Sequence, residues 1–102
     1  MSSAPRRLLA LHYAYVEDVL ERRPPHREAH LAQVSEWADD GRLVIAGALG
    51  DPPHGALFAF DCSEEEVEEF AAADPYRAAG LITEHRIEPW TVVAHRAPDR
   101  DR

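Results

Sequence analysis

Hydrophobic and aromatic residues of this chain gather in four segments, and two further segments repeat their apolar residues at helical spacing. The four segments are rich in aliphatic and aromatic side chains, which favour extended strands. The spacing in the other two is typical of helices with one side against a core. The pattern predicts strands at residues 7–15, 43–49, 56–62 and 81–95, and helices at residues 26–40 and 63–73.

The first predicted helix has a clear start and a clear end. It follows Pro24 and Pro25, whose fixed φ and missing N–H suit a first helical turn. Gly41 is placed to take the left-handed conformation that ends helices. The residues expected to form its buried stripe are Leu31, Val34 and Ala38, with Trp37 at the edge.

Two polar residues share the predicted inward side of this helix. Arg27 and His30 lie three or four positions from Leu31 and Val34, so they point the same way. Burying a polar group without a partner costs about 1–3 kcal/mol. Both side chains therefore need partners, and the partners decide what this face of the helix does.

The second predicted helix begins at a capping box, with Ser63 at the N-cap and Glu66 three residues later. Pro75 interrupts the helical pattern, and Asp74 can cap a short helix over residues 75–79. A glycine inside the strand at 43–49, Gly47, suggests a bulge or a close approach by a ligand or another backbone.

The predicted order of elements is β-α-β-β-α-β, which is the order of a ferredoxin-like sandwich, an α+β fold. Two helices cover one face of a four-stranded sheet. The first three strands are nevertheless apolar on both faces, which is not typical of a sheet with one face in water. We therefore expect the helix-free face to meet the sheet of a second copy in a homodimer. Pro89 marks the last strand as an edge strand or the site of a bulge.

Composition narrows the class of protein. The 102 residues predict a single domain over residues 7–96, with flexible ends at 1–6 and 97–102. A net charge of −8 argues against a nucleic-acid partner, which needs a basic surface. The single cysteine, Cys62, cannot form an internal disulfide, and no apolar run reaches the roughly 18 residues of a membrane span. A cytoplasmic protein with no membrane partner is expected.

The predicted topology brings several polar residues to one corner. The two main helices run antiparallel, so His30, early in the first, lies near Asp74, at the end of the second. The first strand delivers Tyr13 and Tyr15 to the same end. A carboxylate beside an imidazole fixes its tautomer and raises its basicity, as a general base requires. The alternative interpretation is that Asp74 is only a helix cap and His30 a core histidine.

Three motifs resemble the YCII-related (YciI-like) domain family over residues 7–95. They are Arg27-x-x-His30-Leu31, Gly41-Arg42-Leu43 leading to Ala46-Gly47, and Ala73-Asp74-Pro75-Tyr76-x-Ala78-Ala79-Gly80-Leu81. The resemblance implies a dimeric ferredoxin-like α/β-barrel and an active site in which His30 and Asp74 form a dyad. Some relatives are dehydrochlorinases that act on chlorinated hydroxyhydroquinones. Ala48 stands where the family often has proline.

The resulting hypothesis is a lyase- or dehydrochlorinase-like protein that needs no cofactor. His30 and Asp74 would perform acid/base chemistry, an elimination or isomerisation, on a small organic molecule, phenols included. The residues expected to bind that molecule are Arg27, Tyr13, Tyr15, Gly47 and Tyr76, although Tyr76 is of a type that more often serves packing. A non-catalytic ligand-binding module and a purely structural dimerisation domain remain open alternatives.

A metal site and a reactive cysteine are two weaker candidates. His26 and His30 have the i, i+4 spacing of a helical metal pair, but no third ligand is evident, so no metal site is predicted. Acidic neighbours of Cys62 are expected to raise the pKa of its thiol, which argues against a nucleophile there.

Overall fold

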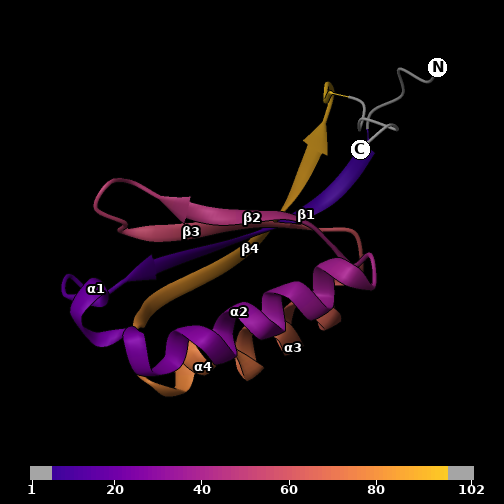
Figure 1. Ribbon diagram of the computed structural model, residues 1–102. Helices are drawn as coiled ribbons and strands as arrows, with labels where there is room; N and C mark the ends of the chain where they lie inside the picture. The colour runs from indigo at the N-terminus through magenta and orange to yellow at the C-terminus, as the bar shows by residue number, and fades with distance from the viewer. Residues whose placement is uncertain (1–5, 97–102) are drawn as a thin grey trace.

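The computed structural model describes residues 6–96, which form one four-stranded antiparallel sheet with all helices on one face (Figure 1). The elements in chain order are β1 (Arg6–Tyr15), α1 (Val19–Arg22), α2 (Pro24–Asp39), β2 (Leu43–Leu49), β3 (Gly55–Phe60), α3 (Glu64–Ala73), α4 (Pro75–Ala78) and β4 (Ile82–Val92). The predicted flexible ends lie outside the described residues, apart from Arg6, with which β1 begins.

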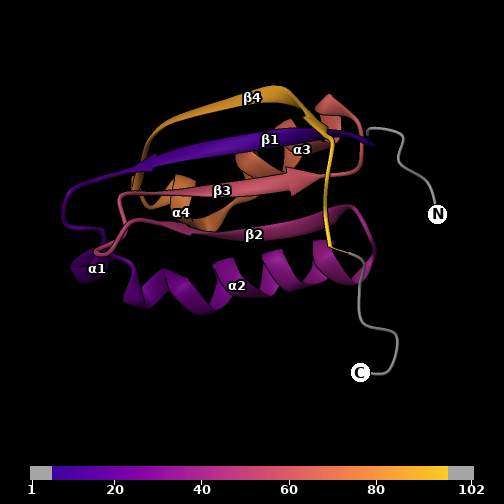
Figure 2. The same ribbon diagram turned by 90° about the horizontal axis from the view of Figure 1, so that it is seen from above.

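The strand order β2-β3-β1-β4 confirms the ferredoxin-like α+β fold (Figure 2). The central strand β1 pairs with β3 on one side and β4 on the other, so that Leu11 faces Phe58 in one neighbour and Ile87 in the other. The prediction of an edge strand around Pro89 is correct, because β4 has a neighbour on one side only. Proline is tolerated there because an edge strand has backbone groups that the ladder does not use.

Aromatic side chains fill the space between the sheet and the helices. Phe58 and Phe60 of β3 point toward Phe70 of α3, at centroid distances of 5.3 and 5.1 Å. Trp37 of α2 closes this cluster with an edge contact to Phe70 at 5.2 Å. Such edge-to-face pairs stabilise a core beyond the area that they bury. The cluster fixes α2 and α3 side by side on the sheet.

Two of the three residues predicted for the buried stripe of α2 are exposed. Leu31 is 43% exposed and Ala38 is exposed, whereas His30 and Trp37, seven residues apart, are buried. Val34 is half-buried and packs against the core, and His30 faces inward, both as predicted. Arg27, which was also predicted to face inward, is exposed, and Leu31 lies beside an open cavity that is described below.

Several boundaries also differ slightly from the prediction. The third strand ends at Phe60, because Asp61 already turns toward the cap of α3 and its N–H donates to the carbonyl of Arg42. The last strand ends at Val92, three residues before the predicted end. The register shift in β2 falls between Leu43 and Ile45, so the bulge is not at Gly47.

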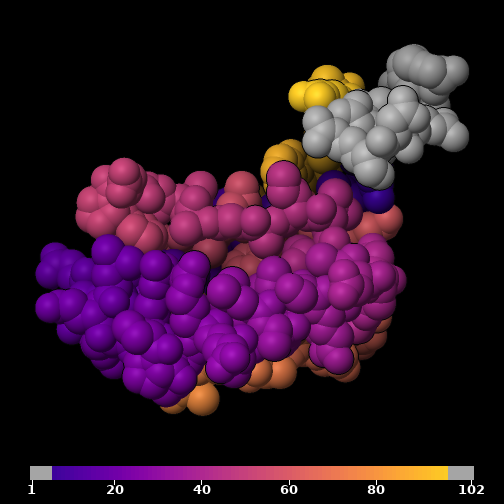
Figure 3. All heavy atoms as spheres, in the orientation of Figure 1, coloured from indigo at the N-terminus to yellow at the C-terminus, as the bar shows by residue number. Residues whose placement is uncertain are grey.

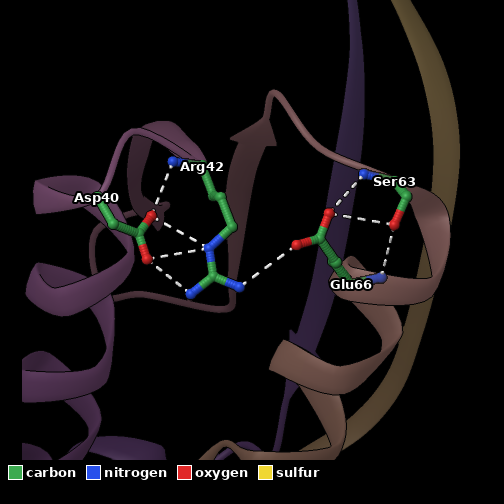
Figure 4. A network of polar contacts seen from close by, with 4 residues as sticks. All are labelled: Asp40, Arg42, Ser63 and Glu66. Carbon is green, nitrogen blue, oxygen red and sulfur yellow. Dashed lines mark hydrogen bonds and ion pairs between the residues drawn. The ribbon is translucent and has the colours of Figure 1, made fainter.

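The end of α2 and the start of α3 are joined by an exposed polar network (Figure 4). Ser63 and Glu66 form the predicted capping box, with both of its hydrogen bonds present. Arg42 donates to Asp40 at 2.6 Å and to Glu66 at 3.5 Å. The guanidinium carbon of Arg42 also lies 3.6 Å from the ring centroid of Trp37. This network closes the turn from α2 into β2 and ties it to the start of α3.

The opposite face of the sheet carries no helix among the described residues, as Figure 1 shows. The end of β4 leaves the plane of the sheet and passes over this face (Figures 1 and 2). A cavity of about 580 Å³ lies beneath it, with Leu8, Ala59 and Trp90 among its lining residues. The helix-free face is therefore apolar and hollowed.

Candidate active site

His30 and Asp74 are in direct contact. The Nδ1 atom of His30 lies 2.9 Å from Oδ1 of Asp74, and both residues are buried, with 7% and 1% of their surface exposed. His30 comes from the second turn of α2, and Asp74 from the junction between α3 and α4. The antiparallel arrangement of α2 and α3 thus brings together two residues that are 44 positions apart.

Asp74 accepts three hydrogen bonds. Besides His30, the hydroxyl of Tyr13 donates to Oδ2 at 2.8 Å, and the backbone N–H of Tyr76 donates to Oδ1 at 2.9 Å. The last bond caps α4, so Asp74 is both a helix cap and the partner of His30. Three donors are the kind of environment that a buried carboxylate needs in order to remain charged. The sequence interpretation of Asp74 as a helix cap and the functional interpretation are therefore compatible.

The contact with Asp74 fixes which nitrogen of His30 is available. A carboxylate that accepts from Nδ1 favours the tautomer with its proton on Nδ1, which leaves the lone pair on Nε2. No described residue bonds to Nε2, and His30 lines a cavity. The imidazole also stacks on the ring of Tyr76, at a centroid distance of 3.9 Å and an angle of 7°. Its orientation is thus held on two sides.

The cavity beside His30 has a volume of about 300 Å³. It lies along the seam between α2 and the β2–β3 hairpin, two elements that Figure 3 shows packed against each other. This volume is at the lower end of the range for small-molecule sites, which suits a molecule with a single ring. The lining residues include Arg23, Arg27, His30, Leu31, Val34, Tyr15, Gly47, Phe58 and Tyr76.

The structure places the predicted site residues in two groups. Tyr15, Arg27, Gly47 and Tyr76 line the cavity together with His30. Tyr13 is not part of the cavity wall, and its hydroxyl is engaged by Asp74. It therefore lies behind the pair, where it supports Asp74. Asp74 is likewise separated from the cavity by the imidazole that it holds.

The surroundings of Gly47 and Arg27 answer two questions from the sequence. A Cβ added to Gly47 would meet nothing within 4 Å, so no backbone approaches it closely. Gly47 instead leaves room on the cavity wall. Arg27 was expected to need a partner on the inward side of the helix, but it makes no hydrogen bond to Asp74 and is exposed at the cavity mouth.

One charged residue of the site was missed in the sequence. Arg23 lines the cavity, but it was not among the residues expected to bind a ligand. The signal that could have found it is its spacing, because Arg23 and Arg27 are four positions apart at the start of a helix and so project to the same side.

Burial changes the pKa values of the two tyrosines of β1. It raises the pKa of Tyr13 far above the usual range, and the neighbouring Asp74 adds to this increase. Burial also raises the pKa of Tyr15, with Tyr76 and Asp74 adding to the effect and the charges of Arg23 and Arg27 opposing it. Both hydroxyls consequently keep their protons at neutral pH; that of Tyr13 donates to Asp74, and that of Tyr15 makes no hydrogen bond to a described residue.

Metal ligands and membrane spans were searched for over residues 6–96. No group of three or more histidine, cysteine, aspartate or glutamate side chains there is arranged to hold a metal ion, and His26 adds no ligand set to His30. No helix in that range is long and apolar enough to cross a membrane.

Comparison with known proteins agrees with this architecture. The family model for the YCII-related domain matches residues 8–91. Protein YciI of Escherichia coli O6:H1 and that of Shigella flexneri are each 35% identical over 86 residues, which cover 74% of this chain and 88% of each relative. The solved structure of the dehydrochlorinase TftG from Burkholderia phenoliruptrix AC1100, which acts on 5-chloro-2-hydroxyhydroquinone, was determined in complex with 2,5-dihydroxybenzoquinone. It superimposes with a TM-score of 0.69 at 23% identity, over 81% of this chain and 92% of that one, and so shows a shared fold.

Proposed function

The chain belongs to the YCII-related domain family, and from this premise we propose that it catalyses acid/base chemistry on a small organic molecule, with His30 as the general base. The observation that carries the proposal is the buried contact of 2.9 Å between His30 and Asp74, with the second imidazole nitrogen left free beside a cavity. Pairs of this kind activate a histidine at neutral pH.

The proposed reaction begins with the transfer of a proton to Nε2 of His30. The proton comes from an O–H or an acidic C–H of the substrate, and Asp74 stabilises the positive imidazolium through the N–H on Nδ1. In an elimination, the electron pair left behind forms a new double bond and the leaving group departs with its own bonding pair. In an isomerisation, His30 returns the proton to a different atom. Neither course requires a cofactor.

The remaining residues have supporting roles in this proposal. Tyr13 holds Asp74 in place through its hydroxyl, at 2.8 Å. Tyr76 fixes the plane of the imidazole by stacking and forms part of the wall. Arg27, at the mouth of the cavity, attracts an anionic group, and Tyr15 and Gly47 complete the site. The positioning is rigid because Asp74 and Tyr76 are tied to each other by the cap of α4.

The TftG comparison supports the class of substrate. That protein is a dehydrochlorinase of a chlorinated hydroxyhydroquinone, and the molecule in its structure is a planar six-membered ring with acidic hydroxyl groups. A cavity of about 300 Å³ with an aromatic wall suits a ring of this size. We therefore propose phenols and related enols as the substrates to test first.

Para-nitrophenol provides a direct test, because its ionised form is coloured. If His30 accepts the phenolic proton, binding to the wild-type protein will increase the ionised fraction at a pH below the pKa of the free phenol. His30→Gln will abolish this increase, while His26→Gln, one turn earlier and not among the residues lining the cavity, will retain it. Equal ionisation in the wild type and in His30→Gln would contradict the proposal. Saturable binding without ionisation would instead favour a non-catalytic binding module.

We also propose that the helix-free face of the sheet pairs with a second copy of the chain. Ile45, in the β2–β3 hairpin, is 65% exposed, and Val93, directly after the end of β4, is 76% exposed. Both residues lie around this face. A dimer would bury them as a two-fold interface between sheets. Sedimentation should show a dimer for the wild type and a monomer for Ile45→Glu. The control Ala32→Glu, on the exposed side of α2, should remain dimeric. A wild-type monomer at high concentration would disprove the pairing.

A further inference from the structure

The mouth of the cavity holds two cationic side chains whose charges are not used within the protein. Arg23 and Arg27 both line the cavity, and neither guanidinium group makes a hydrogen bond or an ion pair with any residue between 6 and 96. Elsewhere in the chain, Arg6, Arg22, Arg42 and Arg86 are each paired with a carboxylate. The guanidinium groups of Arg7 and Arg77 make no such pair with a described residue, but neither residue lines the cavity. In a protein of net charge −8, two unpaired guanidinium groups at one opening are a distinct feature.

The cavity is also free of competing negative charge. None of its lining residues within the described part of the chain is acidic, and Asp74 lies behind the imidazole. Both guanidinium charges oppose the increase in the pKa of Tyr15, which lines the same cavity. An anion entering the mouth would therefore meet attraction from both guanidinium groups.

A second unused polar group lies deeper in the same site. The hydroxyl of Tyr76 is buried and has no hydrogen-bond partner, although Tyr76 lines the cavity and is only 1% exposed. A buried hydroxyl without a partner costs free energy, which a bound ligand can recover. The rings of Tyr15 and Tyr76 are 6.1 Å apart, so two phenolic groups neighbour each other there. The site thus has charge at its mouth and neutral hydroxyl groups inside.

We propose that the ligand is a carboxylic acid: a single-ring molecule whose carboxylate is held at the mouth by Arg23 and Arg27. Its ring lies along the wall, and its reacting O–H or C–H reaches Nε2 of His30. The inference rests on the proposed function, since it assigns a substrate class to the same cavity. It adds Arg23 as a specificity-determining residue.

Carboxylate suits this mouth better than phosphate. Phosphate sites at helix starts use backbone N–H groups. The first two residues of α2 are Pro24 and Pro25, which have no N–H to offer. The donors that remain are the planar guanidinium groups, whose paired hydrogen bonds are enough for the two oxygens of a carboxylate. A phosphate could use the same groups but would lack the backbone N–H donors that its sites at helix starts add.

The test compares two ligands that differ only in the carboxylate. Phenol and meta-hydroxybenzoate are titrated into the full chain and followed by NMR. We expect the wild type to bind meta-hydroxybenzoate at least tenfold more tightly. This preference should fall severalfold in Arg23→Gln and in Arg27→Gln, and should approach one in the double variant. Arg7→Gln, which removes the same charge at an exposed position of β1 outside the cavity wall, should retain the full preference.

Three results would overturn the inference. These are equal binding of the two ligands to the wild type, an unchanged preference in the double variant, and tighter binding of phenyl phosphate than of meta-hydroxybenzoate. His30→Gln separates this inference from the proposed function. It should lose proton transfer to para-nitrophenol and still prefer the carboxylate. A wild type that prefers the carboxylate but transfers no proton would contradict the acid/base function and leave the ligand class intact.

Discussion

The two ends of the helix layer are built from similar polar parts in opposite environments. At one end, Asp74 bonds to an imidazole and caps α4, with 1% of its surface exposed. At the other end, Asp40 bonds to Arg42, beside the cap that Ser63 provides for α3 (Figure 4). The side chains of Asp40 and Arg42 are 41% and 33% exposed.

The two ends differ in whether water can solvate the polar groups when a pair breaks. When an exposed ion pair breaks, water solvates both partners, so the pair contributes little to stability. When the buried pair breaks, its partners remain in a low-dielectric surrounding with no substitute. In the proposed function, the same low dielectric would strengthen the coupling between His30 and Asp74 on which proton transfer depends. The exposed end closes a turn, whereas the buried end lies beside the cavity.

Replacing the buried carboxylate should give the largest effect. Asp74→Ala leaves the donors on His30, Tyr13 and the backbone of Tyr76 without an acceptor, so we expect a loss of roughly 3–5 kcal/mol in the free energy of unfolding. Urea denaturation of the purified variant measures it. The matched substitution at the exposed end, Asp40→Ala, should leave the unfolding midpoint close to that of the wild type. A comparable loss in both variants would remove the distinction between the two ends.

A smaller effect should follow from removing a single donor at the buried end. Tyr13→Phe keeps the edge contact with Phe58 at 4.9 Å but leaves Oδ2 of Asp74 without its hydrogen bond. We expect a loss of about 2 kcal/mol, the usual cost for a buried bond to a charged group. Tyr15→Phe is the matched control, because its hydroxyl makes no hydrogen bond to a described residue. Similar unfolding midpoints for the two variants would show that Asp74 does not depend on Tyr13.

The buried end was predictable from the sequence to the extent that it depends on topology. The capping signal at Asp74 and the antiparallel course of the helices were enough to place it beside His30. The inward side of α2 was predictable at His30, but its exact bounds were not, because Leu31 and Ala38 fit a buried stripe as well as Trp37 does. The orientation of α2 depends on where the cavity opens, and the packing of α2 against β2 sets that position. The same reason explains why Arg23 was missed.

The exposed end should respond mainly through its helix cap. Ser63→Ala removes the acceptor for the N–H of Glu66, at 3.2 Å, and we expect a loss of about 1 kcal/mol. The value is smaller than that for Asp74→Ala because water can reach the freed N–H. Urea denaturation again provides the measurement, with Ser35→Ala on the exposed side of α2 as a control for the substitution itself. A loss as large as that in Asp74→Ala would mean that the exposed end is as tightly coupled to folding as the buried one.

The smallest effect concerns Cys62, which reports on the electrostatics of the exposed end. Burial raises the pKa of its thiol from 9.0 to about 11; Glu66 adds to the increase and Arg42 opposes it. A raised pKa in the folded state means that the protonated thiol contributes stability below pH 9. This contribution is lost as the pH rises toward 11. The ultraviolet absorbance of the thiolate should therefore titrate near pH 11 in the wild type and lower in Glu66→Gln. Arg42→Gln, which removes the opposing charge, should shift the titration upward. A thiol that titrates at its ordinary value in all three proteins would show that this end is fully solvated and that its charges do not reach Cys62.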